Sequence, residues 1–311
     1  MDLHYDKDAA GNRLEEIAKL SRASLAARNL KSIVHMADIN LIDVDVRETN
    51  AGRKNWRLCI VEEDDELNDE LVIRVQGILT KNNLVPRNVQ SCAPNKAQYL
   101  SQHIEICGAA TSTFTESMAN LQAVADRFEH QLAGIEIAPM QEVARAPDDI
   151  FVASNRIFTL KSDVPAEQDN FFQDGVDSAG LLHKLKRRDY IHAPENIVKY
   201  YRKKNSTNAG MAYVQFYPGG FQIGDIVELQ VSFVAVATGR GKAKITTRLH
   251  AVTLLDSKYS NDAATSRSAS ALRQLSNPAI RKKVGYSAED EEDARKVKKA
   301  RTETPDREND T

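Results

Sequence analysis

The chain has 311 residues, of which 41% are hydrophobic, so it is long enough to build one large or two ordinary domains around a proper core. Its 42 basic and 44 acidic residues leave a formal net charge of -2, which excludes an overall electrostatic attraction to nucleic acid or to anionic membranes. The first residues lack a secretion signal, and no segment approaches the run of about eighteen apolar residues that spans a membrane, so no membrane partner is expected.

The first half of the chain is expected to mix helices and strands. Apolar residues recur at helical intervals over residues 12–30 and predict an amphipathic helix. Alternation of apolar and polar residues over 37–49 and 55–63 predicts two antiparallel strands. Residues 67–79 follow an acidic run and favour a helix, although several of them are β-branched.

The clearest helix is predicted between Thr113 and Gly134. Thr113 or Thr115 can cap its N-terminus, and the glycine marks its end. Its predicted buried stripe comprises Met118, Leu121, Val124, Ala125, Phe128 and Leu132. Residues 138–147 are weakly patterned and contain two prolines, so they predict a domain boundary.

The strongest pattern lies over residues 221–256, where alternation by twos around a glycine-rich break predicts a β-hairpin. Its core face is expected to comprise Val227, Leu229, Val231, Phe233, Ala235, Ala243, Ile245, Thr247, Leu249 and Ala251. The opposite face of the second arm carries a basic stripe, defined as Lys242, Lys244, Thr246, Arg248 and His250. A turn over 237–241 would pair Val236 with Lys242 and leave Glu228 as the only carboxylate opposite the stripe.

Two aromatic-rich strands over 197–202 and 211–217 precede this hairpin, and consecutive antiparallel strands of this kind can form a small barrel. We therefore predict an α+β fold in three parts. These are a mixed α/β domain over residues 1–147, an antiparallel β-rich domain over 148–257 and a largely disordered charged tail over 258–311. The tail has charged blocks with few apolar residues, which cannot offset the entropy of ordering the chain.

The basic stripe suggests one function. Single-stranded nucleic acid is bound by cations that attract phosphates and by aromatic rings that stack on bases, at about 1–3 kcal/mol per base. The predicted interface comprises Arg240, Lys242, Lys244 and Arg248 for the phosphates and Tyr200, Tyr201 and Tyr213 for stacking. The alternative interpretation is an ordinary solvent-facing sheet surface, on which lysine and arginine prevent aggregation at the edge.

The tail carries two basic clusters separated by eleven residues. They consist of Lys282 and Lys283, followed by Arg295, Lys296, Lys298 and Lys299. Exposed cations at this spacing fit the two acidic grooves of a nuclear import receptor, so the predicted location is the nucleus. The alternative is a solvated tail of mixed charge, because acidic residues fill the spacer.

No pattern in the sequence indicates catalysis, a metal or a cofactor. The three cysteines are odd in number and scattered, which indicates a reducing compartment, and Cys92, His103 and Cys107 lack the paired spacing of zinc ligands. No nucleophile elbow or phosphate loop occurs. We expect no cofactor and favour a non-enzymatic protein, since an enzyme would have to gather residues such as His103, His192 and Asp225 in a pocket.

Residues 190–256 carry a series of motifs: IHAPENIVKYYRK, then FQIGDIVELQVSF, then LHAVTLLD. The series resembles a large, uncharacterised group of proteins from mushroom-forming (basidiomycete) fungi, which is multiplied in their genomes as mobile-element and chromatin-associated families often are. The resemblance rests on Ile191, His192, Asn196, Val198, Tyr200, Tyr201, Phe221, Gly224, Asp225, Val227, Glu228, Gln230, Ser232 and Phe233. The chain departs from the group's usual acidic box by having Ala193-Pro194-Glu195.

Three functions follow from these observations. The first is a nuclear protein that binds DNA or RNA through the hairpin, with salt-sensitive affinity. The second is a module that binds another protein or itself through exposed strands or the predicted helix, with salt-tolerant assembly. The third is an enzyme whose site forms only in three dimensions.

Overall fold

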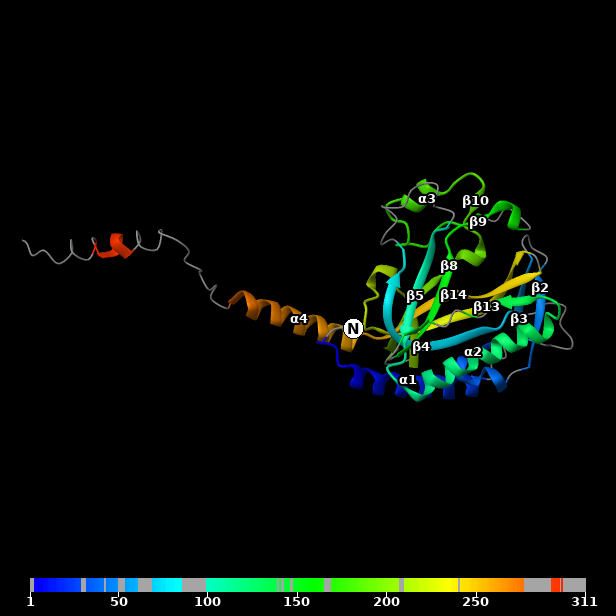
Figure 1. Ribbon diagram of the computed structural model, residues 1–311, viewed down its shortest axis with the longest axis horizontal. Helices are drawn as coiled ribbons and strands as arrows, with labels where there is room; N and C mark the ends of the chain where they lie inside the picture. Colours follow the sequence, from blue (N-terminus) through cyan, green and yellow to red (C-terminus); the bar gives the residue numbers. More distant parts are fainter. Residues whose placement is uncertain are drawn as a thin grey trace, which may run out of the picture. The chain divides into compact units, whose positions relative to one another are not determined.

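The structure is a computed structural model that describes residues 3–28, 32–41, 43–49, 54–60, 69–85, 99–138, 140, 143–145, 148–164, 169–206, 210–239, 241–276, 292–296 and 298 (Figure 1). The chain divides into two compact units, Met1–Thr265 and Ser266–Thr311, and each is described by itself.

The first unit is built on one mixed sheet (Figure 1). Its main path runs through β12 (Gly210–Gln215), β11 (Lys199–Ser206), β14 (Lys242–Asp256), β8 (Asp148–Arg156), β5 (Ser101–Cys107), β4 (Val72–Asn83), β13 (Ile226–Gly239), β3 (Asn55–Ile60) and β2 (Val44–Thr49). Because β14 also pairs with β13, the strands β13, β4, β5, β8 and β14 close a ring. The predicted α+β class with a barrel-like sheet is confirmed.

Shorter elements complete the fold. The additional strands are β1 (Ile33–His35) beside β4, β6 (Glu136–Ala138) beside β14, β7 (Val143–Arg145) beside β8, and the separate pair β9 (Thr159–Leu160) and β10 (Tyr190–Ile191). The helices are α1 (Lys7–Arg28), α2 (Ser112–Gln131), α3 (Leu181–Leu185) and α4 (Lys258–Ser276). The 3₁₀ turns are η1 (Met36–Leu41), η4 (Lys161–Asp163), η5 (Pro194–Asn196) and η6 (Pro218–Gly220).

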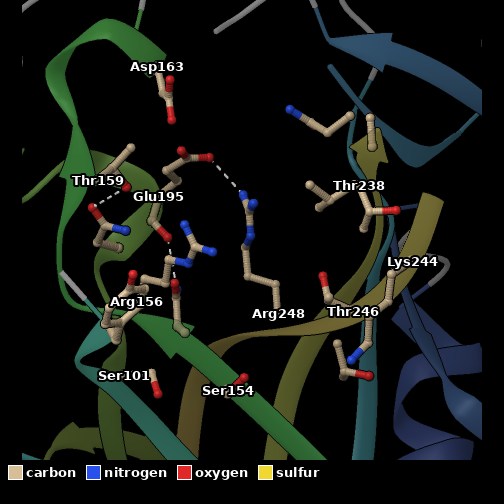
Figure 2. A pocket seen from close by; sticks show the side chains of 17 residues that line it. Ser101, Ser154, Arg156, Thr159, Asp163, Glu195, Thr238, Lys244, Thr246 and Arg248 are labelled. Atoms are coloured by element: carbon tan, nitrogen blue, oxygen red, sulfur yellow. Dashed lines mark hydrogen bonds and ion pairs between the residues drawn. The ribbon is translucent and has the colours of Figure 1, made fainter. Parts of the chain in front are cut away.

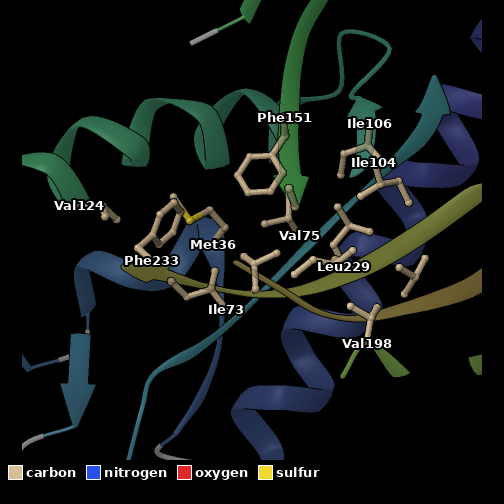
Figure 3. Packing of buried hydrophobic residues seen from close by; sticks show 14 of the residues in the cluster. Met36, Ile73, Val75, Ile104, Ile106, Val124, Phe151, Val198, Leu229 and Phe233 are labelled. Carbon is tan, nitrogen blue, oxygen red and sulfur yellow. The ribbon is translucent and has the colours of Figure 1, made fainter. Parts of the chain in front are cut away.

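Apolar side chains of the ring strands and of α2 form the main core (Figure 3). Phe233 and Leu229 of β13, Phe151 of β8 and Val124 of α2 all belong to this cluster. The predicted stripe of α2 is confirmed, since Leu121, Val124, Ala125, Phe128 and Leu132 are buried and Met118 packs against them. Burial of this stripe, at about 1.5–3 kcal/mol for each large apolar side chain, fixes α2 against the sheet.

Helix α1 packs on the other face of β4 and β13. Its Leu14 and Ile17 contact Ile78 and Ile226, whose neighbours along each strand point into the main core. The predicted amphipathic helix is therefore confirmed, and it begins five residues earlier than the apolar spacing indicated, at Lys7. Arg13 of α1 also reaches the end of β14, where it pairs with Asp256 at 3.3 Å.

The predicted hairpin is confirmed as β13 and β14, with its register shifted by two residues. Val236 pairs with Lys244 rather than Lys242, because positive φ angles of 101° at Gly239 and 73° at Gly241 permit a tighter turn than expected. A shift of two residues keeps the side chains from Val231 to Leu249 on their predicted faces, and Thr247 is the only member of the predicted core face that is not buried. Ala251, also predicted on the core face, is buried on the opposite face, where it pairs with Lys199. A bulge at His250 then changes the alternation along the rest of β14.

The helix expected over 67–79 is wrong, because residues 72–79 belong to strand β4. Ile73 and Val75 are fully buried, and β4 lies between β13 and β5 with its backbone paired on both sides. β-Branched side chains suit a central strand of this kind, and the pairing with residues far along the chain outweighs the local helical preference.

The domain boundary expected near residue 147 does not separate two compact units. Strands from both sides share one sheet, since β5 pairs with β8 over seven residue pairs and β4 pairs with β13. The unit instead ends at Thr265, within α4. The predicted tail boundary at 257/258 falls at the start of α4, a 19-residue helix whose Ser260 is buried and donates a hydrogen bond to Asp225.

Candidate functional site

The structure separates the residues of the predicted hairpin interface. Arg240 lies outside the described residues. Lys242 pairs with Glu136 of β6 at 2.8 Å, and Arg248 pairs with Glu195 of η5 at 2.7 Å. The expectation that Glu228 is the only carboxylate opposite the stripe is therefore wrong, because Glu136 and Glu195 come from segments outside the hairpin.

Lys244 has no ion-pair partner among the residues that the structure describes. Tyr200, predicted to stack on bases, has a ring that is 2% exposed and a hydroxyl that donates a hydrogen bond to Gln102. Side chains alternate between the two faces of β11, so Tyr200 faces the core while its neighbour Tyr201 faces outward. The prediction that Tyr200 stacks on bases is therefore wrong, and its role is structural.

Tyr201 and Tyr213 lie together on the outer face of the sheet. Both line an open pocket of about 730 Å³, here called the sheet-face pocket. Its lining comprises Glu70, Val72, Arg74, Pro194, Ile197, Lys199, Tyr201, Tyr213, Gln230, His250, Ala251 and Thr253. The ring of Tyr213 is 45% exposed, so this tyrosine has a free surface for a ligand.

Lys203 adds a second cation beside Lys199 on the same face. Residues 199, 201 and 203 of β11 alternate with the inward-facing ones, and Lys203 pairs across the strands with Tyr213. Burial lowers the pKa of Lys203, and the nearby charge of Glu228 counteracts this only in part. The face therefore carries two aromatic rings and two lysines on adjacent strands.

The carboxylates near this face are already neutralised. Glu228 receives a hydrogen bond from Gln76 and pairs with Arg74 at 3.4 Å. Glu70 pairs with Arg57 at 2.9 Å. In the described part of the chain Lys199, which lines the sheet-face pocket, and Lys203, on the same face of β11, have no carboxylate partner. This face of β11 therefore has an excess of positive charge.

A second pocket, of about 460 Å³, lies where β8 diverges from β14 and is here called the seam pocket (Figure 2). Its charged lining residues are Arg156, Asp163, Glu195, Lys244 and Arg248. Arg248 extends from β14 toward Glu195, with Thr246 and Lys244 on one side and Thr159 and Arg156 on the other (Figure 2). Both pockets border η5, which supplies Pro194 to one and Glu195 to the other.

Glu195 is held by two arginines. Arg57 and Arg248 both donate to its Oε2 atom, at 2.9 and 2.7 Å. Burial alone would raise the pKa of Glu195, but the charges of Arg248 and Arg57 outweigh it and lower that pKa. The carboxylate is therefore charged at neutral pH.

The residues of the predicted import signal lie in part outside the described residues, namely Lys282, Lys283 and Lys299. Arg295, Lys296 and Lys298 are described and exposed, the first two within a helical turn over 292–296 of the second unit. Lys296 lies 3.9 Å from Asp293, a weak contact that leaves its ammonium group accessible.

The residues named for an enzyme make separate contacts. His103 pairs with Glu105, His192 bonds to the carbonyl of Ile157, and Asp225 accepts from Ser260. Among the described residues no group of three or more potential ligands could hold a metal ion. No described helix is both long and apolar enough to cross a membrane.

No protein-family model matches this chain, and no curated protein matches it in sequence. The resemblance to the fungal group over residues 190–256 stays a prediction.

Sequence reasoning missed Glu195, Arg57, Arg74 and Lys199 as members of these surfaces. Lys199 could have been found, because it alternates with Tyr201 within a predicted strand. Arg57 and Glu195 are 138 residues apart, and no local pattern connects them.

Proposed function

We propose that the protein binds single-stranded nucleic acid in the nucleus, through the outer face of β11, β12 and β14. The observation that carries the proposal is the grouping of Tyr201, Tyr213 and Lys199 around one open pocket. Lys203 lies outside the lining of this pocket, on the same face of β11, and pairs across the strands with Tyr213. Aromatic rings supply stacking that tolerates any base sequence, and lysines without carboxylate partners attract the phosphates. The proposed site therefore lies closer to β11 than the site predicted on the hairpin around Lys242.

Nuclear location is the second part of the proposal. It is supported by the exposed cations Arg295, Lys296 and Lys298 and by the spacing of the two basic clusters in the sequence. The partner implied is a nuclear import receptor. Fusion of residues 277–311 to a fluorescent protein is expected to concentrate it in nuclei, and a diffuse distribution would remove this part of the proposal.

The direct test is fluorescence anisotropy with labelled single-stranded DNA, single-stranded RNA and duplex DNA over a salt series. Tyr213→Ala is expected to raise the Kd for single strands by about 5- to 100-fold, which corresponds to the loss of one stacked base. Tyr217→Ala is the matched control, because Tyr217 is 48% exposed and lies on the η6 side of β12. Equal effects of the two substitutions would contradict the proposed location.

The lysines have an equally close control. Lys203→Gln is expected to reduce the slope of log K against log salt by about 0.7, the share of one phosphate contact on a single strand. Lys204→Gln removes the same charge from the next residue of β11, whose side chain projects from the other face, and is expected to change the slope much less. Absence of binding by the unaltered protein at low salt would eliminate the nucleic-acid function.

Assembly with another protein is the alternative function, and one observation favours it. Among the described strands, β2 and β12 each pair along one edge only, and an open edge can accept a strand from another chain. Light scattering after size-exclusion chromatography separates the two functions. An oligomer that persists at high salt and is unchanged by Tyr213→Ala would favour assembly as the function.

A further inference from the structure

The convergence of Arg57 and Arg248 on one oxygen of Glu195 forms a slot for an anion. The three side chains come from β3, η5 and β14, and both N–O distances are below 3.0 Å. Two guanidinium groups directed at one oxyanion are the arrangement that proteins use for carboxylate and phosphate alike. In this structure the carboxylate of Glu195 occupies the slot, and Figure 2 shows its contact with Arg248.

The side chain of Glu195 can leave this slot without moving its backbone. The main-chain carbonyl of Glu195 accepts a hydrogen bond from Asn155 at 2.8 Å, and the next residue, Asn196, accepts one from Thr159 at 3.0 Å. The η5 turn is thus anchored independently of the two arginines. Departure of the carboxylate requires only a rotamer change, and Glu195 has 35% of its side chain exposed to receive water in exchange.

The rest of the seam pocket is suited to a group more negative than a carboxylate. Arg156 and Lys244 line it and have no ion-pair partner among the described residues. Ser101 and Ser154 add hydroxyl groups to the same lining. With Glu195 displaced, Asp163 is the only acidic side chain left among the lining residues, whereas three lining side chains are cationic: Arg156, Lys244 and Arg248.

The size and rim of the pocket favour a nucleoside attached to that group. Its volume of about 460 Å³ lies in the range of small-ligand sites. Tyr99 lines it with 75% of its surface exposed and offers a ring for a base, and Asp163 offers an acceptor for sugar hydroxyls.

We propose that the seam pocket binds the phosphomonoester of a nucleoside, whose phosphate displaces the Glu195 carboxylate from Arg248 and Arg57. The phosphate carries about 1.5 to 2 negative charges near neutral pH, so it replaces the single charge of Glu195 with a larger one. The ligand is either a free mononucleotide or the phosphorylated end of a strand. The site is separate from the sheet-face pocket and does not require the function proposed for it.

Calorimetric titration of the full chain with 5′-AMP, with adenosine and with inorganic phosphate tests the proposal. The protein is expected to bind 5′-AMP and to bind adenosine at least about tenfold more weakly, because only the nucleotide can use the two arginines. Glu195→Gln is expected to tighten 5′-AMP binding by about tenfold or more, since the neutral amide competes poorly for the slot. Lys244→Gln, which leaves the Arg57–Glu195–Arg248 contacts intact, is expected to weaken it.

Equal affinities for 5′-AMP and adenosine, or an unchanged affinity for 5′-AMP in Glu195→Gln, would overturn the proposal. Thermal unfolding followed by circular dichroism verifies that each variant is folded, and Lys244→Gln supplies the test if Glu195→Gln is not folded.

Oligonucleotides with 5′-phosphate and 5′-hydroxyl ends distinguish the two sources of the ligand, a strand end and a free nucleotide. Tighter binding of the phosphorylated strand assigns the site to strand ends, and equal binding assigns it to free nucleotides. Tyr213→Ala should leave 5′-AMP binding unchanged, so failure at one pocket is distinguishable from failure at the other.

Discussion

Replacement of Phe233 by alanine is expected to lower the free energy of unfolding by about 3–5 kcal/mol. The ring of Phe233 is fully buried on β13, in the core where α2 meets the barrel-like sheet (Figure 3). Its removal takes away apolar burial and leaves a cavity that the surrounding strands cannot collapse to fill, because their backbones are paired on both sides. Urea unfolding followed by circular dichroism measures the change.

Phe171→Ala is the matched control for this loss. Phe171 is 95% exposed, so the same change of side chain is expected to alter stability by less than about 0.5 kcal/mol. A Phe233→Ala variant as stable as Phe171→Ala would show that the packing between α2 and β13 is not as described.

Acidification from pH 7.5 to 5.5 is expected to destabilise the protein steeply. Burial lowers the pKa values of His35, His192 and His250. The unfolded chain takes up protons near the ordinary histidine pKa of about 6.5, whereas the folded protein takes them up only at lower pH. The contribution of these neutral histidines to stability is therefore fully present above the pKa of the unfolded chain and is lost as the pH falls below it. The loss approaches about 1.4 kcal/mol per pH unit for each fully buried histidine.

His35 shows why the folded protein resists this proton. Its Nδ1 accepts a hydrogen bond from the backbone N–H of Ala37 at 3.1 Å, so the proton on the ring is on Nε2, 2.9 Å from Gln76. A second proton would have to occupy Nδ1 and face that N–H. Burial raises the pKa of Asp225, so the contribution of this carboxyl group to stability changes with pH in the opposite direction.

Urea titrations at pH 7.5, 6.5 and 5.5 measure the slope of stability against pH. His35→Gln is expected to reduce this slope by up to about 1.4 kcal/mol per pH unit below pH 6.5. His183→Gln removes an exposed histidine and serves as the control. A slope that His35→Gln leaves unchanged would contradict the buried neutral state of this residue.

The sequence was sufficient for elements whose pattern is local. The hairpin of β13 and β14 was predicted because alternation over adjacent segments needs no other part of the chain, and the stripe of α2 because its period is unambiguous. Strand β4 was not predicted, since a run containing Ile73 and Val75 fits a buried helix or a central strand equally well. Its identity depends on partners β5 and β13, which no single segment shows.

The candidate site was predicted less well for the same reason. Tyr201 and Tyr213 were named from two neighbouring strands, and the structure places both in one pocket. The charges were misjudged because an ion pair does not depend on sequence distance. Glu195 lies 53 residues from Arg248 and 138 from Arg57, and it neutralises Arg248, one cation of the predicted stripe.

The position of β14 has a consequence for synthesis of the protein. Strands β13, β6, β8 and β11 all pair with β14, which ends at Asp256. The ring of strands thus cannot close on the ribosome until the segment Lys242–Asp256 has left the exit tunnel. Until then the edges of β13, β6, β8 and β11 that pair with β14 are unpaired in the nascent chain. Unpaired strand edges promote aggregation, so we expect the chain to depend most on chaperones during this interval.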